Sequence, residues 1–187
     1  IPEKHYTVVR TGLIAEGFEM VEDERYFTIW APRQTGKSTY FRQLADALSK
    51  HGYIVAHINF EDYKNTPLQT FTKRFVEQIN GFWGTSYGIT DISDIFNEIE
   101  KEKKKKCVLI IDEVEGINPE YFGDFLHSIR RVYHSRNEHC LKSVILVGVS
   151  NIVGVVNDNA SPFNIVDNLN VPYFTDEEVF VLLGQHE

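Results

Sequence analysis

A short polar segment, Gly36-Lys37-Ser38-Thr39, has the residue types needed to bind a polyphosphate. Glycine lacks a Cβ, so the main chain can approach an anion closely at Gly36, and a helix that begins there points its free N–H groups at the same anion. Lys37 can reach the terminal phosphates, and the hydroxyl of Ser38 can ligate Mg²⁺. We therefore predict a nucleotide-phosphate site made of Pro32, Arg33, Gln34, Thr35, Gly36, Lys37, Ser38 and Thr39.

The neighbours of this segment decide how specific the prediction is. Gly-Lys followed by Ser or Thr occurs by chance in about one in ten chains of this length, and the complete phosphate-loop motif has glycine where this sequence has Ala31. The alternative is a plain surface turn. However, the segment follows an apolar run at residues 26–31 and precedes a helical pattern that carries Phe41, Leu44 and Leu48. This strand–loop–helix context is the one that phosphate binding requires.

Two acids follow one another at the end of a second apolar run, C-V-L-I-I-D-E. A continuously apolar run is typical of a strand covered on both faces, and its carboxyl end is where open α/β sheets bind ligands. Asp112 would hold Mg²⁺, and Glu113 would deprotonate an attacking water. The alternative is a strand end with solvated acids. Asn151, beyond the run at residues 143–149, could bond a phosphate oxygen or that water, or be a simple turn residue.

Short strands that alternate with helices must position these side chains, and this alternation predicts a parallel sheet with crossover helices. We predict strands at residues 26–31, 54–60, 107–112, 143–149 and 171–174, with loops at residues 83–91 and 152–170. Capping boxes at Thr66 and Thr175 and the Asn118-Pro119 pair mark three helix starts. The expected fold class is α/β, a three-layer sandwich.

Composition narrows the classes of function. A chain of 187 residues fits one α/β domain, so residues 1–187 are treated as a single nucleotide-binding core. The net charge of −8 argues against a dedicated nucleic-acid surface, and the lysine run at residues 101–106 is expected to be a solvated helix end and turn. No apolar run approaches the roughly 20 residues of a membrane span. Cys107 and Cys140 lack metal-ligand spacing, so we expect reduced thiols in a cytoplasmic protein.

These motifs, in this order, resemble the AAA+ family of P-loop ATPases. A-P-R-Q-T-G-K-S is similar to its Walker A motif, L-I-I-D-E to Walker B, and L-V-G-V-S-N to sensor 1 of the origin-recognition ATPases. The stretches R-Y-F-T-I-W-A-P-R-Q-T-G-K-S-T and V-P-Y-F-T-D-E-E-V look closer still to bacterial "AAA-like domain" ATP-binding proteins. The resemblance covers nearly the whole chain.

The resemblance implies a P-loop NTPase fold whose five-stranded parallel sheet has the order 5-1-4-3-2, with a helical lid that would begin at Glu187 and is absent from this chain. It also implies that ATP and Mg²⁺ are bound by Lys37, Ser38 and Asp112, that Glu113 is the catalytic base, and that Asn151 is the sensor. An arginine finger, acting on the ATP of a neighbouring subunit, would be one of Arg130, Arg131 and Arg136; surface arginines are often only solvated, so the choice stays open. The implied partners are ATP and ADP, further copies of the chain in a homo-oligomer, and an unidentified protein client.

Two functions of different classes follow from these residues. An ATPase would use Mg²⁺-dependent hydrolysis to act on a partner or flanking domain. A nucleotide-dependent switch would bind ATP or ADP and signal with little or no turnover. Glu113 beside Asp112 favours hydrolysis, because a switch could dispense with the base. A small-molecule kinase shares the phosphate loop, but the sequence shows no separate acceptor-binding motif.

Overall fold

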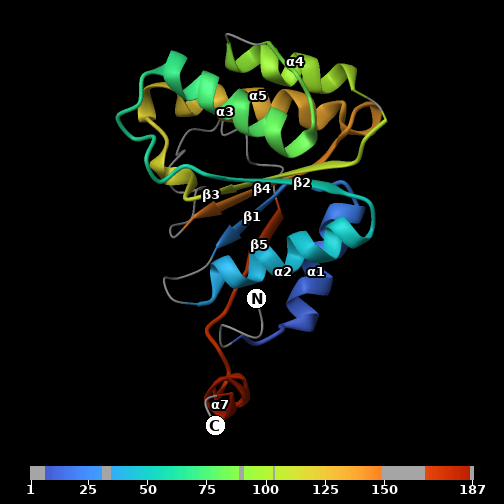
Figure 1. Cartoon of the computed structure of the whole chain (residues 1–187), viewed down its shortest axis with the longest axis vertical. Helices are drawn as coiled ribbons and strands as arrows, with labels where there is room; N and C mark the ends of the chain where they lie inside the picture. The colour runs from blue at the N-terminus through green and yellow to red at the C-terminus, as the bar shows by residue number, and fades with distance from the viewer. Residues whose placement is uncertain (1–6, 31–34, 89–90, 103, 149–166, 186–187) are drawn as a thin grey trace.

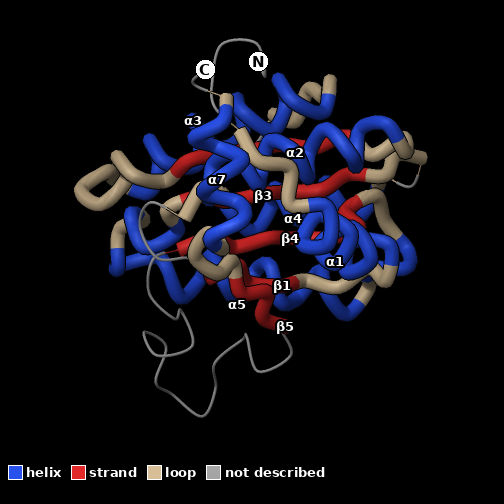
Figure 2. Tube along the Cα trace, turned by 90° about the horizontal axis from the view of Figure 1, so that it is seen from below, coloured by secondary structure: helices blue, strands red, loops and turns tan. Residues whose placement is uncertain are grey.

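A five-stranded parallel sheet forms the centre of the molecule in the computed structural model, which describes residues 7–30, 35–88, 91–102, 104–148 and 167–185. Its strands are β1 (Phe27–Trp30), β2 (Ile54–Asn59), β3 (Cys107–Asp112), β4 (Leu141–Gly148) and β5 (Asp167–Asn170). They lie in the order β2-β3-β4-β1-β5, and each neighbouring pair is parallel. Read from the other edge, this is the predicted order 5-1-4-3-2, and Figure 2 shows β3, β4, β1 and β5 in succession. The predicted P-loop NTPase fold is confirmed.

Helices cover both faces of the sheet (Figure 1). One face carries α1 (Thr11–Glu22) and α2 (Lys37–Lys50), and the other carries α3 (Leu68–Trp83), α4 (Ile92–Lys101) and α5 (Pro119–His134). The last described helix, α7 (Asp176–Gly184), follows β5 and lies apart from the sheet, below α2 in Figure 1. The result is the expected three-layer sandwich.

Alternate side chains of β3 supply the two layers of the core. Leu109 and Ile111 pack with the helices of the α3–α5 face, whereas Val108 and Ile110 pack with α1 and α2. All four side chains are fully buried, as predicted for a strand covered on both faces. Burying each of them contributes about 1.5–3 kcal/mol relative to exposure. This buried strand is the rigid support that carries Asp112 to its carboxyl end.

The fifth strand, β5, lies at Asp167–Asn170, four residues before the predicted range 171–174, so that prediction is wrong. In the predicted range, Val171 is buried in the core and Tyr173 is 66% exposed. The real strand reads D-N-L-N, and only Leu169 is buried. Asp and Asn are depleted in strands, so pairing with β1 makes this segment a strand despite its composition.

The start of α3 also differs from the prediction. Its N-cap is Pro67 and no side chain caps the helix, so the predicted capping box at Thr66 is wrong. The residue before a proline is disfavoured in helical geometry, and the Thr66 hydroxyl instead donates to the carbonyl of Asp62 at 3.3 Å. The other two starts are confirmed: Asn118 accepts a bond from the Glu120 N–H, and Thr175 forms a complete capping box.

Helix α1 is not among the predicted elements. Glycines at positions 12 and 17 weaken its helical signal, because glycine is a poor helix former. Packing explains Gly17: the hydroxyl oxygen of Tyr40 from α2 lies 2.3 Å from where a Cβ would be, too close for a side chain. The close contact between α1 and α2 therefore stabilises a helix that local propensity does not indicate.

Candidate nucleotide-binding site

The phosphate-loop prediction falls on the junction between β1 and α2. Gly36 is the N-cap of α2 and has a φ of +78°, a conformation that side-chain-bearing residues rarely adopt. Lys37 is the first residue of the helix, and Ser38 and Thr39 follow in its first turn. The free N–H groups of this turn suit an anion. Thr35 is buried, whereas the predicted residues Pro32, Arg33 and Gln34 lie outside the described residues.

The ammonium group of Lys37 joins the two predicted sites. Its Nζ lies 3.0 Å from Asp112 Oδ1 and 2.7 Å from Glu113 Oε1. The side chains of Lys37 and Asp112 are 12% and 7% exposed, so these charges meet in a largely desolvated place. Burial lowers the pKa of Lys37, but its hydrogen bonds to Glu113 and Asp112 outweigh burial and raise the pKa above its ordinary value. The lysine is therefore charged at neutral pH.

The turn after β3 directs both acids toward α2. Glu113 has a φ of +51°, in the left-handed region, and its N–H donates to Asp112 Oδ1 at 2.9 Å. This kink ends the strand and lets two consecutive side chains converge on one ammonium, whereas consecutive side chains of a regular strand point to opposite faces. Positive φ in a residue other than glycine is uncommon. Here it occurs at the residue predicted to be the base.

His57 is a site residue that the sequence prediction missed. It lies on β2, and its Nε2 is 4.0 Å from Asp112 Oδ2, whereas Lys37 pairs with Oδ1 of the same carboxylate. That nitrogen is buried and has no hydrogen-bond partner among the described residues. Burial lowers the pKa of His57, although Asp112 opposes the shift. The available signal in the sequence is weak, a lone histidine within an apolar strand.

A cavity of about 250 Å³ opens beside the N-terminus of α2. Gly36, Thr39, Tyr40 and Gln43 line it from the side of α2. The opposite walls come from both ends of the described chain: Thr7, Val8, Arg10, Phe174 and Leu182. The sequence prediction missed these walls, because nothing in the sequence indicates that residues 7–10 lie next to α7.

Among the described interactions, none of the three candidate arginines lines the α2 cavity or bonds to Lys37, Asp112 or Glu113. Asn151 lies outside the described residues. Arg131 donates to the Ser93 carbonyl at 3.0 Å, and the guanidinium of Arg136 lies 4.1 Å from the centre of the Tyr133 ring. Arg130 has no hydrogen-bond or ion-pair partner in the part of the chain that the structure describes. Arg130 and Arg131 lie near the end of α5, and Arg136 lies between α5 and the start of β4. The phosphate site is at the carboxyl ends of the strands, and an eight-residue strand such as β4 spans about 23 Å. An action on a neighbouring subunit's ATP stays a prediction.

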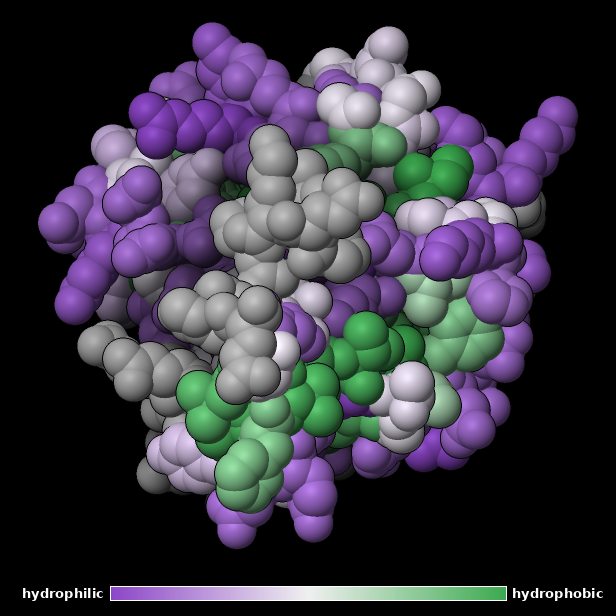
Figure 3. Space-filling model, turned by 60° about the horizontal axis from the view of Figure 1, so that its bottom comes forward, coloured by the Kyte–Doolittle hydropathy of each residue, from purple (hydrophilic) through white to green (hydrophobic). Residues whose placement is uncertain are grey.

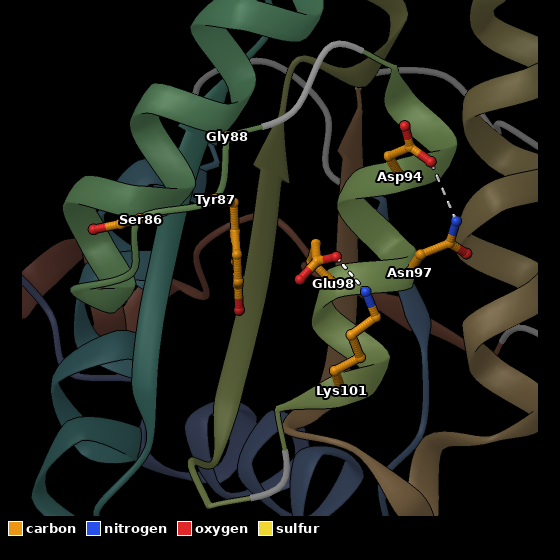
Figure 4. A pocket seen from close by; sticks show the side chains of 7 residues that line it. All are labelled: Ser86, Tyr87, Gly88, Asp94, Asn97, Glu98 and Lys101. Atoms are coloured by element: carbon orange, nitrogen blue, oxygen red, sulfur yellow. Dashed lines mark hydrogen bonds and ion pairs between the residues drawn. The ribbon is translucent and has the colours of Figure 1, made fainter.

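A second polar cavity lies between the α3–α4 connection and α4 (Figure 4). Its volume is about 470 Å³, and Asp94, Glu98 and Lys101 give it a net negative lining. Lys101 is paired with Glu98, and Asn97 donates to Asp94. A phosphate therefore finds no unpaired cation among the residues that line this cavity, whereas the α2 cavity lies beside the helix N-terminus that carries Lys37.

Three lysines of the charged run, Lys101, Lys105 and Lys106, have partners among the described residues. Helix α4 ends at Lys101, as the prediction of a helix end implies. Lys105 donates to the Trp83 carbonyl at 2.8 Å, and the ammonium of Lys106 lies 5.5 Å from the centre of the Tyr53 ring. Within the described ranges, no helix has the length and hydropathy of a membrane span.

Comparison with known proteins shows which solved structures and which family this chain is similar to. The Walker-type ATPase of Pyrococcus abyssi has a similar structure, with a TM-score of 0.71, 16% identity, and coverage of 98% of this chain and 58% of that one. Cdc6p from Pyrobaculum aerophilum gives a TM-score of 0.65 and 15% identity, over 96% of this chain and 49% of that one. A chain from the Drosophila ORC bound to DNA gives a TM-score of 0.61 and 16% identity, over 86% and 40%.

The chain thus spans about half the length of the structures it resembles. Among curated proteins, no relative matches the sequence. The family described as "AAA-like domain" matches residues 19–187. That range includes Lys37, Asp112 and Glu113, the three charged groups that meet at the N-terminus of α2. The chain belongs to the AAA-like domain family, with the fold of an AAA+ P-loop ATPase.

Proposed function

We propose that this domain binds ATP together with Mg²⁺ and hydrolyses it, and that the nucleotide state is passed to a partner or a flanking domain. The observation that supports the proposal most strongly is the meeting of Lys37 with Asp112 and Glu113 at the first turn of α2. Residues 75 and 76 positions apart in the sequence are brought within hydrogen-bond distance where a helix presents free N–H groups. A surface turn with solvated acids would not require this convergence.

Lys37 and the first turn of α2 would bind the phosphates. The ammonium is charged and held at the helix N-terminus, so an incoming phosphate meets a cation and several N–H donors at once. In the described structure the cation is compensated by two carboxylates. Phosphate oxygens would therefore compete with Glu113 for Lys37, and binding would release the carboxylate of Glu113.

The donor set at this place suits Mg²⁺, which prefers oxygen ligands and keeps several waters. Asp112 is 5% exposed, and its Oδ2 lies 4.0 Å from His57 Nε2. The Ser38 hydroxyl is exposed in the first turn of α2. Among the described residues, no group of three or more His, Cys, Asp or Glu could hold an ion alone, so Asp112 and Ser38 would hold Mg²⁺ together with phosphate oxygens and water. Bound Mg²⁺ would stabilise the charge that develops on the phosphates.

Glu113 would act as the general base. Its side chain is 31% exposed, so water can reach the carboxylate. Once Lys37 has turned to the phosphates, the carboxylate can accept a proton from a water that attacks the terminal phosphorus. The left-handed backbone at Glu113 holds the side chain on the same side as Lys37. Sensor action by Asn151 belongs to the proposal through the family resemblance.

The cavity beside α2 would receive the nucleoside. It adjoins Gly36, so a chain of phosphates at the helix N-terminus leads directly into it. Phe174 and Leu182 supply apolar walls, and Thr39 and Gln43 supply hydrogen-bonding groups. This mixture of apolar walls and a few polar groups is typical of small-molecule sites. The choice of adenine over guanine rests on the family resemblance.

Helix α7 supports coupling to a partner or flanking domain. Its apolar side chains are largely exposed, with Phe180 at 73% and Leu183 at 62%. Figure 3, in which the end of the molecule that carries α7 comes forward, shows a green apolar patch on this face. Contiguous exposed apolar surface marks interaction sites. Because Leu182 of the same helix lines the nucleoside cavity, this surface adjoins the site whose state would be read. Homo-oligomers, with an arginine acting in trans, belong to the same proposal.

A thermal-shift comparison of ATP, ADP and GTP with and without Mg²⁺ tests binding. A ligand present at about a hundred times its Kd stabilises the folded chain by roughly 2.7 kcal/mol. We expect stabilisation by ATP and ADP that exceeds stabilisation by GTP. Absence of stabilisation by any of the three nucleotides would contradict the proposal.

The alternative function, a switch with little turnover, is favoured by one observation: Glu113 is occupied by Lys37 in the described state. Single-turnover hydrolysis of radiolabelled ATP by the wild-type chain, measured alone and in a longer chain that carries the lid, distinguishes the two functions. Tight ATP binding without cleavage in either chain would identify a switch.

A further inference from the structure

Arg10, outside the phosphate site, makes three hydrogen bonds to distant parts of the chain. Its Nε donates to Glu178 Oε1 at 2.9 Å, its Nη1 to the Pro172 carbonyl at 2.9 Å, and its Nη2 to the Tyr173 carbonyl at 3.1 Å. The side chain is only 9% exposed. All three partners lie more than 160 residues away in the sequence: Pro172 and Tyr173 are between β5 and α7, and Glu178 is in the first turn of α7. One guanidinium thus attaches the beginning of the described chain to its end.

The segment that Arg10 holds carries Phe174, and the Phe174 ring lies against Gly36. The guanidinium carbon of Arg10 lies 5.2 Å from the centre of the Phe174 ring. The ring edge lies 2.8 Å from where a Cβ on Gly36 would be. Gly36, Arg10 and Phe174 all line the same cavity. The position of the ring is therefore set on one side by Arg10 and on the other by the absence of a side chain at Gly36.

Glu178 extends this attachment to α7. Its Oε1 accepts from Arg10, while its Oε2 accepts from the Thr175 N–H at 2.9 Å in the capping box. The start of α7 and the Arg10 contact thus share one carboxylate, and Leu182, one turn further on, forms the next part of the cavity wall. A second tie joins Thr7 and Gln185 by two hydrogen bonds of 2.9 Å. These hydrogen bonds hold the residues of this cavity wall to one another.

We infer that Arg10 is a positioning residue for the nucleoside end of the site: it holds Phe174 against Gly36 so that the ring forms one wall for the base. The inference rests on the proposed function, because it assumes that a nucleotide is the ligand. Arg10 itself contacts neither Lys37 nor the two acids among the described interactions, so it is separate from the groups that bind phosphate. A lysine cannot replace it, since one ammonium does not reproduce a planar fork that bonds three acceptors.

Comparison of two ligands isolates this role. ADP needs both ends of the site, whereas inorganic pyrophosphate needs only the phosphate loop. We would measure the affinity of each by isothermal titration calorimetry with the 187-residue chain and with Arg10→Ala, Arg10→Lys and Phe174→Ala. The expected result for each variant is a loss of ADP affinity of about tenfold or more, with pyrophosphate affinity within about twofold of wild type.

A double-mutant cycle tests whether Arg10 acts through Phe174. If it does, the chain carrying both alanines loses no more ADP affinity than either single variant, because coupled residues are not additive. Arg25→Ala is the matched control. Arg25 also forms an ion pair with the β5 region, at 3.2 Å from Asp167, but Asp167 is the first residue of β5 and does not line the α2 cavity. We expect both of its ligand affinities to stay at the wild-type values.

Three outcomes would overturn the inference. They are equal losses of ADP and pyrophosphate affinity, unchanged ADP affinity in Arg10→Ala, and additive losses in the double variant. Phe174→Ala provides the same comparison if Arg10→Ala does not fold, because it leaves the three hydrogen bonds of Arg10 in place. Failure of the proposed function has a different signature, since the wild-type chain would then bind neither ADP nor pyrophosphate.

Discussion

Removal of the negative charge from Glu113 should stop ATP cleavage and also tighten nucleotide binding. In the described structure Glu113 Oε1 lies 2.7 Å from Lys37 Nζ, so the carboxylate competes with phosphate for the lysine. Glu113→Gln keeps the size and hydrogen-bonding capacity of the side chain but removes this competition. It also removes the repulsion between a carboxylate and the phosphates. Both effects change affinity in the same direction.

The exposure of the pair sets the size of the effect. The Glu113 side chain is 31% exposed and that of Lys37 is 12% exposed, so solvent screens the attraction considerably. Partly exposed pairs contribute up to about 1 kcal/mol, which corresponds to about a fivefold gain in ADP affinity. Because the contribution is electrostatic, the gain should shrink as salt is raised. Lys37 keeps its contact with Asp112 at 3.0 Å, so the fold should be retained.

The assay is a titration with ADP by calorimetry at low and high salt, without Mg²⁺, followed by single-turnover hydrolysis of ATP with Mg²⁺. Glu61→Gln is the control, because Glu61 is exposed at the end of β2 and the substitution removes the same charge. We expect its affinity and turnover to match wild type. Unchanged or weaker ADP binding by Glu113→Gln would refute the competition between Glu113 and phosphate. Wild-type turnover by that variant would refute its assignment as the base.

Three further predictions concern the same site. Lys37→Ala should abolish detectable ADP binding and lower the free energy of unfolding by roughly 1–3 kcal/mol, because Asp112 stays buried without its cation; calorimetry and urea unfolding measure the two effects, and wild-type affinity would contradict the phosphate site. Gly36→Ala should destabilise the chain by about 1–2 kcal/mol, since φ is +78° there and the new Cβ would meet Phe174 at 2.8 Å; an unchanged melting temperature would show that the junction differs from the one described. Asp112→Asn should abolish the additional stabilisation by Mg²⁺ in thermal shifts with ATP, while ADP alone still binds. An unchanged Mg²⁺ effect would show that residues other than Asp112 hold the metal.

Local sequence patterns predicted the elements that surround the phosphate site and failed at the edges of the molecule. The apolar run at residues 107–112 coincides with β3, because a strand buried on both faces needs apolar side chains at every position. Polar β5 and glycine-containing α1 have no such signal. Both exist because a neighbour stabilises them: β1 pairs with β5, and α2 packs against α1. Those contacts cannot be deduced from either segment alone.

By itself, the sequence determined which residues have the chemistry to bind a nucleotide and in what order they occur: glycine and lysine at a helix start, and two acids at a strand end. These features are local, because they depend on residue type and on the neighbouring few positions. Only the tertiary structure decided that Lys37 lies between Asp112 and Glu113, that His57 faces the second oxygen of Asp112, and that Arg10 attaches the chain's beginning to the wall of the nucleoside cavity. Strand order and helix packing bring such distant residues together. These contacts cannot be deduced from a pattern of neighbouring residues, because they depend on how whole elements pack.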